Sequence, residues 1–194
     1  MFLKRASGWR QTAEMVASDS VARNSFGTDV AISGTTLFVG AYERVYVFTR
    51  TVAGWKQTAE LKASDDSAGD FFGESGVAVS GTTVVVGASG HGDYAGRAYV
   101  FTKTKDVWEE TAELVGPDTV AGDWFGSSVA ISGKTAIVGA TGYAKIAGRA
   151  ELKGSDTRSG DYFGSSVAIS GKIAIGGTSH VVRSGSRYLP HDLA

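Results

Sequence analysis

The feature that most constrains this chain is internal repetition. Three segments, Trp9–Glu14, Trp55–Glu60 and Trp108–Glu113, are near copies of one another, and each leads into a Phe-Gly pair. The Phe-Gly pairs are spaced 46, 53 and 38 residues apart: Phe26-Gly27, Phe72-Gly73, Phe125-Gly126 and Phe163-Gly164. A period of this length suits one small sheet per repeat. The chain is therefore predicted to be an array of repeated units.

Within each repeat the apolar residues alternate over short stretches, as they do in β-strands. In the copy that spans residues 72–114, residues 76–80 are predicted to form one strand and residues 83–88 to return antiparallel. Residues 98–102 and the segment opening at Trp108 supply two more strands. The corner between the first two strands is Ser-Gly in every copy, and glycine allows the positive φ of a tight hairpin: Ser33-Gly34, Ser80-Gly81, Ser132-Gly133 and Ser170-Gly171.

Four antiparallel strands at this period indicate an all-β fold, a partial β-propeller of about three to four four-stranded antiparallel blades, with the last blades incomplete. Blades crowd together near the axis, where the first strands carry small residues such as Ala31 and Ala130. Towards the rim, aromatic residues recur at equivalent positions: Tyr46, Phe48, Trp55, Tyr99, Phe101 and Trp108. This recurrence favours packing between blades over ligand stacking, and each buried side chain contributes roughly 1.5–3 kcal/mol.

The first three Phe-Gly pairs are each followed by an apolar segment that ends in Gly-Ala, Phe38–Ala41, Val85–Ala88 and Ile137–Ala140, whereas the fourth copy ends in Gly177-Thr178. Over about residues 8–178 the chain resembles the FG-GAP repeat. The residues that carry this motif are the four Phe-Gly pairs together with Gly40, Gly87, Gly139, Trp9, Trp55 and Trp108.

That repeat builds the propeller at the N-terminal end of integrin α subunits, and the microbial form, which this chain resembles more closely, occurs in secreted or surface-attached proteins. The resemblance implies a non-enzymatic interaction module, extracellular or at the cell surface, that serves adhesion or binds a protein or glycan ligand.

The later repeats depart from the pattern. Compared with residues 98–113, the last full repeat lacks 14 residues between Ala150 and Glu151, which removes two strands. We predict a repeat domain over residues 1–180 and an irregular tail over residues 181–194. Three explanations of this small number of blades stay open. The chain is a fragment of a longer repeat protein, which is favoured, or two chains pair to close one ring, or the chain is marginally stable with frayed ends. A fragment without an independent role is an alternative to the binding function.

Composition limits the classes of partner that the chain is expected to bind. The chain has 194 residues with 19 Lys and Arg against 20 Asp and Glu, and no stretch concentrates basic residues, so nucleic acid is not expected as a partner. No apolar run approaches the roughly 20 residues of a membrane span. With no cysteines, disulfides and thiolate sites are excluded. No secretory signal is visible at the start of this chain.

No cofactor is predicted. Calcium follows only from the family resemblance, because integrin blades hold it in the loop between the second and third strands through staggered Asp and Asn ligands. The corresponding loops here, 42–44, 89–96 and 141–148, lack that set, and calcium takes 6–8 oxygen ligands. Paired acidic residues instead precede the Phe-Gly pairs as weak cation candidates: Asp65 and Asp70, Asp118 and Asp123, and Asp156 and Asp161. We favour a structural role, in which these side chains hydrogen-bond the amides of their own loop.

No catalytic residue is predicted. His91, His180 and His191 occupy non-equivalent places in the repeats. His91 with Asp93 on an exposed loop offers an acid–base pair, although a solvated loop pair is the more common meaning of this pattern. A hydrolase or lyase with its site at the mouth of the propeller channel is the alternative, because propellers host such enzymes.

Overall fold

The computed structural model describes residues 1–19, 24–142, 149–150, 164–171, 173–177 and 191–192. The predicted site residues Asp156, Asp161 and Phe163 and most of the predicted tail lie outside these residues. Within the described part, the one helix is a single turn, α1 (His91–Tyr94). No described helix has the length and apolar character needed to cross a bilayer.

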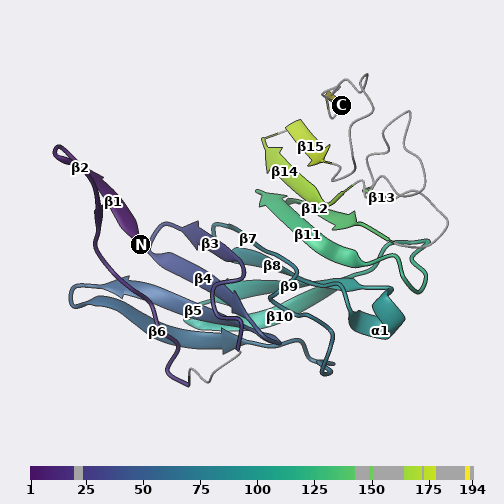
Figure 1. Ribbon diagram of the computed structural model, residues 1–194, viewed down its shortest axis with the longest axis horizontal. Helices are drawn as coiled ribbons and strands as arrows, with labels where there is room; N and C mark the ends of the chain where they lie inside the picture. The colour runs from purple at the N-terminus through teal and green to yellow at the C-terminus, as the bar shows by residue number, and fades with distance from the viewer. Residues whose placement is uncertain (20–23, 143–148, 151–163, 172, 178–190, 193–194) are drawn as a thin grey trace.

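The strands form five antiparallel sheets (Figure 1). We define blade 1 as β3–β6, blade 2 as β7–β10, blade 3 as β11–β13 and blade 4 as β14–β16, while β1 and β2 form a separate hairpin. Their bounds are β1 (Phe2–Arg5), β2 (Gly8–Gln11), β3 (Val30–Ser33), β4 (Thr36–Ala41), β5 (Arg44–Thr51), β6 (Gly54–Leu61), β7 (Val77–Ser80), β8 (Thr83–Ala88), β9 (Arg97–Thr104), β10 (Val107–Leu114), β11 (Phe125–Ser132), β12 (Thr135–Ala140), β13 (Arg149–Ala150), β14 (Ser166–Ser170), β15 (Ile173–Gly177) and β16 (His191–Asp192).

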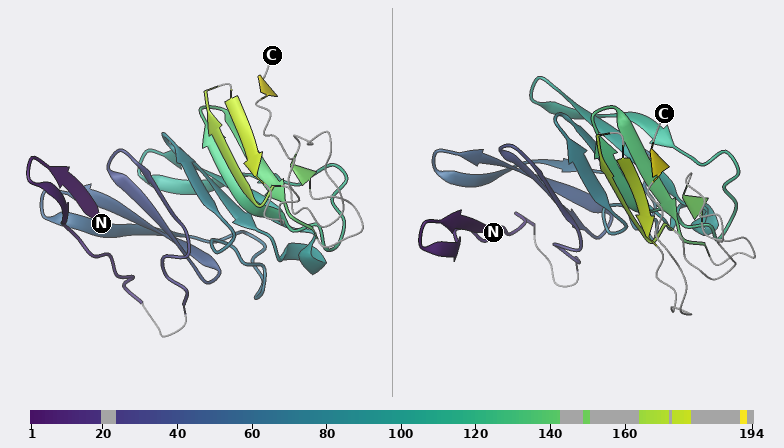
Figure 2. Two further views of the ribbon diagram at one scale, coloured as in Figure 1. Left: turned by 45° about the horizontal axis from the view of Figure 1, so that its top comes forward. Right: turned by 90° about the horizontal axis from the view of Figure 1, so that it is seen from above.

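The predicted fold class is confirmed. Blades 1 and 2 are complete four-stranded antiparallel sheets, and the sheets follow one another across the molecule in chain order (Figures 1 and 2). The first strands contact each other in sequence, β3 with β7, β7 with β11 and β11 with β14, so consecutive blades abut. Among the described residues they share no hydrogen-bonded ladder, only the isolated bridge between Gly96 and Phe125. In blade 3 the third strand, β13, is described at Arg149–Ala150, where it pairs with β12.

The Ser-Gly corners behave as predicted. The glycine of each corner has a positive φ, between 57° and 60°, and joins the first strand of its blade to the second. The corners also connect neighbouring blades, because Ser80 Oγ accepts a hydrogen bond from the Gly133 amide at 3.0 Å. Ser132 Oγ accepts one from the Gly171 amide at 3.3 Å. The first strands are thereby aligned along the inner side of the array.

The main core lies between blades 1 and 2. The Phe-Gly phenylalanine Phe72 is fully buried and makes edge-to-face contacts with Tyr99 and Phe101 of its own blade, at centroid distances of 5.7 and 5.9 Å. Across the blade boundary, Trp108 of β10 packs edge-on against Phe38 of β4 at 5.1 Å. The aromatic residues of the outer strands therefore join one blade to the next.

A second core covers the opposite face of blade 1. Phe26 contacts Tyr46 and Phe48 there, as Phe72 contacts its partners in blade 2. Trp55 is partly buried beside this cluster, whereas Trp9 on β2 remains 69% exposed. The difference has a structural reason, because β1 and β2 form a sheet of two strands that has no inner strands beside it within the described part of the chain.

Candidate functional site

Three loops meet at one end of blades 2 and 3. We call the segments that connect one blade to the next crossovers: residues 62–76 lead into blade 2 and residues 115–124 into blade 3, while residues 89–96 form the loop after β8. The crossover into blade 2 is bonded to the loop after β8, because the Gly90 amide donates to the Asp70 carbonyl at 3.0 Å. The crossover into blade 3 joins the same loop through the Trp124 amide, which donates to the Tyr94 carbonyl at 2.8 Å. Because backbone hydrogen bonds tie these loops together, they present their side chains from a fixed surface.

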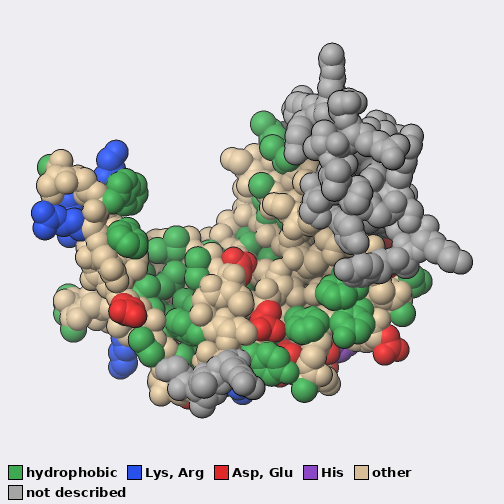
Figure 3. All heavy atoms as spheres, viewed as in Figure 1, with side chains coloured by type: hydrophobic (Ala, Val, Ile, Leu, Met, Phe, Trp, Pro, Cys, Tyr) green, Lys and Arg blue, Asp and Glu red, His purple; other side chains and the backbone are tan. Residues whose placement is uncertain are grey.

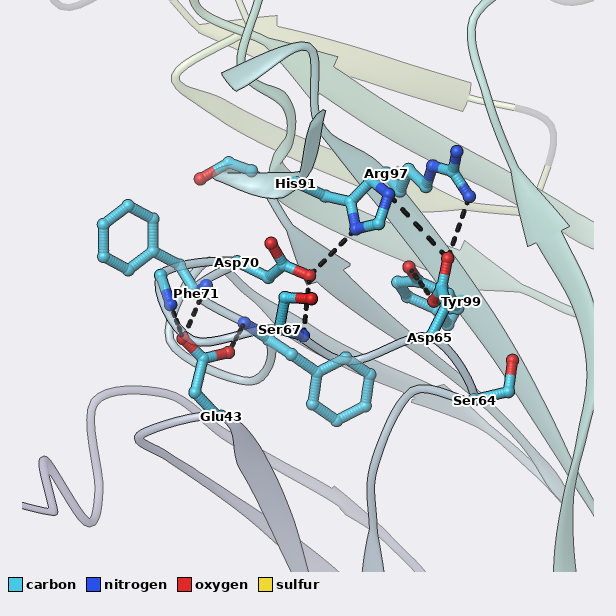
Figure 4. Close-up of polar contacts among 12 residues, drawn as sticks. Glu43, Ser64, Asp65, Ser67, Asp70, Phe71, His91, Arg97 and Tyr99 are labelled. Carbon is cyan, nitrogen blue, oxygen red and sulfur yellow. Dashed lines mark hydrogen bonds and ion pairs between the residues drawn. The ribbon is translucent and has the colours of Figure 1, made fainter. Parts of the chain in front are cut away.

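The first acidic residue of the crossover anchors the third strand of the following blade. Asp65 accepts hydrogen bonds from the Tyr99 hydroxyl at 2.7 Å and from Arg97 at 3.0 Å (Figure 4). Asp19 makes the same two contacts with Tyr46 and Arg44. Burial, and then the hydrogen bond to Asp65, raises the pKa of the Tyr99 hydroxyl, and burial followed by the hydrogen bond to Asp19 raises that of Tyr46. Both hydroxyls therefore act as hydrogen-bond donors.

The second acidic residue folds its own loop. Asp70 accepts from the Ser67 amide at 3.1 Å, and Asp123 accepts from the Val120 amide at 2.9 Å. Both contacts span three residues, which is the local side-chain-to-backbone bonding expected of Asp in turns. Asp118 lies on the same crossover as Asp123.

His91 does not form the exposed pair with Asp93 that the sequence suggested. Its Nδ1 lies 2.9 Å from Asp70 Oδ2, and the two side chains are only 16% and 10% exposed. The reason is the left-handed backbone of Gly92 and Asp93 (φ 60° and 58°), which interrupts α1. His91 thus connects the loop after β8 to the crossover into blade 2 through Asp70 (Figure 4).

Glu43 is a buried residue of the loops that the sequence alone did not single out. It is 6% exposed, and its carboxylate accepts hydrogen bonds from the amides of Gly69 at 2.8 Å and of Phe71 and Phe72 at 3.2 Å (Figure 4). Glu43 belongs to the turn between β4 and β5, so blade 1 holds the crossover into blade 2 through one buried carboxylate. The only sequence signal was an acidic residue beside the anchor Arg44.

Asp66 stands beside this carboxylate. Partial burial, followed by the charges of Glu43 and Asp70, raises the pKa of the Asp66 carboxyl above its ordinary value of 3.8. The folded state therefore binds the Asp66 proton more tightly than the unfolded state, and stability falls as the pH rises through the window above 3.8.

We expect Asp66→Asn to unfold at a higher urea concentration than the parent chain at about pH 7. Its advantage should shrink as the pH falls towards 3.8, because the parent carboxyl is then protonated. Urea titrations at several pH values measure both. The control is Asp106→Asn, at a fully exposed side chain. Equal pH dependence in both variants would contradict the assignment.

These carboxylates do not fit a calcium site. Glu43 turns its oxygens onto three backbone amides, and Asp70 is occupied by the Ser67 amide and His91. Among the described residues no group of three acidic, histidine or cysteine side chains converges as metal ligands would. Calcium needs 6–8 oxygens directed at one point.

Three aromatic rings from the three loops form what we call the aromatic platform: Phe71, Tyr94 and Trp124. Their centroids lie 5.0–6.4 Å apart and their planes are within 35° of parallel. Trp124 stacks on both Tyr94 and Phe71, and Phe71 is tilted against Tyr94, so the three rings pack together as one aromatic cluster. In Figure 3 hydrophobic side chains gather next to α1, with acidic side chains around them.

The platform residues share an unusual backbone. Phe71, Tyr94 and Trp124 have φ of 59°, 63° and 56°, and such left-handed conformations cost non-glycine residues about 1–3 kcal/mol each. In the first repeat Ser25, at the same place before Phe-Gly, also has φ 53°. The left-handed backbone before Phe-Gly thus recurs from repeat to repeat, whereas the first repeat has a serine there and the later two have aromatic residues.

Comparisons with known proteins agree with the fold. A family model described as the FG-GAP repeat matches residues 9–48, 55–101, 108–150 and 147–189. The crystal structure of the computationally designed Ika4 protein is similar, with a TM-score of 0.56 at 15% identity over 95% of this chain and all of that chain. Hydrazine synthase of Kuenenia stuttgartiensis is similar with a TM-score of 0.53 at 20% identity. That match covers 85% of this chain but 45% of hydrazine synthase. A search of curated proteins gives no match.

Proposed function

The chain belongs to the FG-GAP repeat family, and from this membership we propose that it is a non-enzymatic β-propeller interaction module. It works outside the cell or at the cell surface, in adhesion or ligand binding, as the likeness to the integrin α-subunit repeat and its microbial form implies. Its partners are a protein or glycan ligand and, for closing the ring, a second copy of the chain.

The aromatic platform is the observation that carries this proposal. Binding sites combine a mostly apolar surface with a few fixed polar groups, and affinity is greatest where the site is organised before the ligand arrives. The platform is organised in advance, since its loops are joined by backbone hydrogen bonds and the Asp123 carboxylate, next to Trp124 in sequence, is held by the Val120 amide. The part of this aromatic cluster that solvent reaches, chiefly the 45% exposed Tyr94, suits an apolar face such as that of a sugar ring or of an aromatic or proline side chain.

An enzyme at the channel mouth is less well supported. His91 and Asp70 form the best acid–base pair of the described loops, yet both side chains are almost buried and bonded to each other. A substrate proton must come within hydrogen-bonding reach of such a group. A fragment without an independent role is the remaining alternative, and ligand binding by this chain would exclude it.

We expect Trp124→Ala to weaken ligand binding about tenfold or more, because large aromatic residues dominate binding energy where they contact a ligand. The measurement is binding of the chain to immobilised glycan and peptide arrays. Trp9→Ala is the control, because Trp9 is an exposed tryptophan on β2, away from the platform, whereas Trp124 is half-buried in it. Binding that survives Trp124→Ala, or no binding on either array, would count against the platform as the site.

A further inference from the structure

Consecutive blades share one close contact between two glycines. The Gly-Ala glycine of a blade lies against the carbonyl oxygen of the Phe-Gly glycine in the next blade. A Cβ atom placed on Gly40, Gly87 or Gly139 would be 2.0–2.1 Å from the oxygens of the partner glycines: Gly73, Gly126 and Gly164. This contact therefore recurs at each of the three boundaries between blades 1 and 4.

At each end of the array, one glycine of this kind has no partner glycine from a neighbouring blade among the described residues. Gly177 of β15 has the position of Gly87, yet the nearest atom of the described residues to its ideal Cβ is 3.5 Å away, in Ser166 of its own blade. At the other end, Gly27 has the position of Gly73, and no described atom lies within 4 Å of its ideal Cβ. By contrast, the Arg44 carbonyl oxygen of the preceding blade lies 2.4 Å from the ideal Cβ of Gly73.

The strand faces beside these glycines are apolar and exposed. On β3, Ala31 packs towards blade 2, so the alternation of the strand turns Val30 and Ile32 to the opposite face, where they are 58% and 57% exposed. On β15, Ala174 is buried while Ile173 and Ile175 are 49% and 51% exposed.

The same positions inside the array are covered. Val77 of β7, which corresponds to Val30, is 6% exposed, and Val85 of β8, which corresponds to Ile175, is fully buried. The face of β3 is the one that a preceding blade covers, and the face of β15 is the one that a following blade covers. Neither strand contains a charged residue.

We propose that the β15 face of one copy stacks on the β3 face of a second copy, in the register that joins consecutive blades within the chain. The carbonyl of Gly27 then lies against Gly177, and Val30 and Ile32 cover Ile173 and Ile175. This inference rests on the self-association proposed above and names the surfaces that carry it. A second copy is the occupant because both matching halves of the contact are found on one chain.

The interface is heterologous, since each copy uses two different faces. The β1–β2 hairpin corresponds to the two outer strands of a blade, because Phe2 and Trp9 stand 46 residues before Phe48 and Trp55. The hairpin therefore leaves the exposed face of β3 free for a pair of inner strands. β14 and β15 are inner strands and therefore fit beside β3 in the place that precedes this hairpin; β16 pairs with β15 only at Ile173 and Ala174, so most of the outer edge of β15 is free of it within the described residues.

The test is the mass of the 194-residue chain in solution, measured by analytical ultracentrifugation over a range of concentrations. The parent chain should assemble into a species of at least two copies. Ile32→Arg, which charges the β3 face, and Ile175→Arg, which charges the β15 face, should each give one copy. Val52→Arg should assemble like the parent, because Val52 is fully exposed in the β5–β6 turn and lies on neither face.

Mixing the two face variants makes the test specific. Ile32→Arg keeps an intact β15 face and Ile175→Arg keeps an intact β3 face, so their equimolar mixture should form a one-to-one pair and nothing larger. The same pairing also demonstrates that both variants are folded. A parent chain that stays a single copy would overturn the self-association itself. Assembly that survives both substitutions, or variants that do not pair when mixed, would leave self-association intact and overturn the head-to-tail interface.

Discussion

Gly87→Ala should lower the free energy of unfolding by about 3 kcal/mol, the upper part of the range for a side chain forced into a filled space. The added Cβ would lie 2.0 Å from the carbonyl oxygen of Gly126 in the next blade. The neighbour is backbone on a strand, so it cannot turn away as a flexible side chain would. Blades 2 and 3 must therefore separate slightly. Urea unfolding followed by tryptophan fluorescence measures the loss.

Gly177→Ala is the matched control, because Gly177 has the same place in its repeat but no following blade within the described residues. Its new Cβ would have ordinary contacts at 3.5 Å, so we expect a change within about 0.5 kcal/mol. Equal losses in the two variants would mean that the glycines serve their own strands rather than the contact between blades.

Glu43→Ala should cost about 3 kcal/mol. The substitution leaves the amides of Gly69, Phe71 and Phe72 without their acceptor, and each buried amide that loses its partner costs about 1–3 kcal/mol, less where water enters. Since Phe71 belongs to the aromatic platform, the variant should also weaken ligand binding. Urea unfolding gives the stability, and the protection of the three amides from hydrogen exchange locates the damage.

Two further variants test whether the loss of stability comes from the buried carboxylate. Glu43→Gln should be intermediate, because one oxygen remains while the side-chain NH₂ faces a backbone N–H. Glu109→Ala on β10 removes an exposed carboxylate and should change stability by no more than about 0.5 kcal/mol. If Glu43→Ala were as mild as Glu109→Ala, the buried carboxylate would not be what holds the crossover.

Most of the fold follows from local signals that every repeat contains. The Ser-Gly corners predict the hairpins because only a few residues adopt the positive φ that Gly81 and its equivalents show. Alternating small and apolar residues predict the first strands, and recurring aromatic residues predict the contacts between blades. Repetition strengthens each signal, since an isolated corner such as Ser80-Gly81 would carry little weight.

The candidate site was less predictable because its contacts join residues far apart in the sequence. Glu43 meets amides 26–29 residues later, and nothing local distinguishes it from a solvated turn residue. His91 was expected beside Asp93, its sequence neighbour, but the left-handed backbone of that loop turns it to Asp70. The platform depends on three loops whose meeting is set by the stacking of blades 2 and 3.

The central claim is that consecutive repeats stack face to face as blades, and one contact tests it directly. Phe38 of β4 and Trp108 of β10 are 70 residues apart in sequence and lie in different sheets, yet their rings meet edge-on at 5.1 Å. Nuclear Overhauser spectra of the 194-residue chain, with labelled Phe and Trp rings, should show cross-peaks between these two rings. Cross-peaks from Phe38 only to residues of its own sheet would contradict stacked blades and the account built on them.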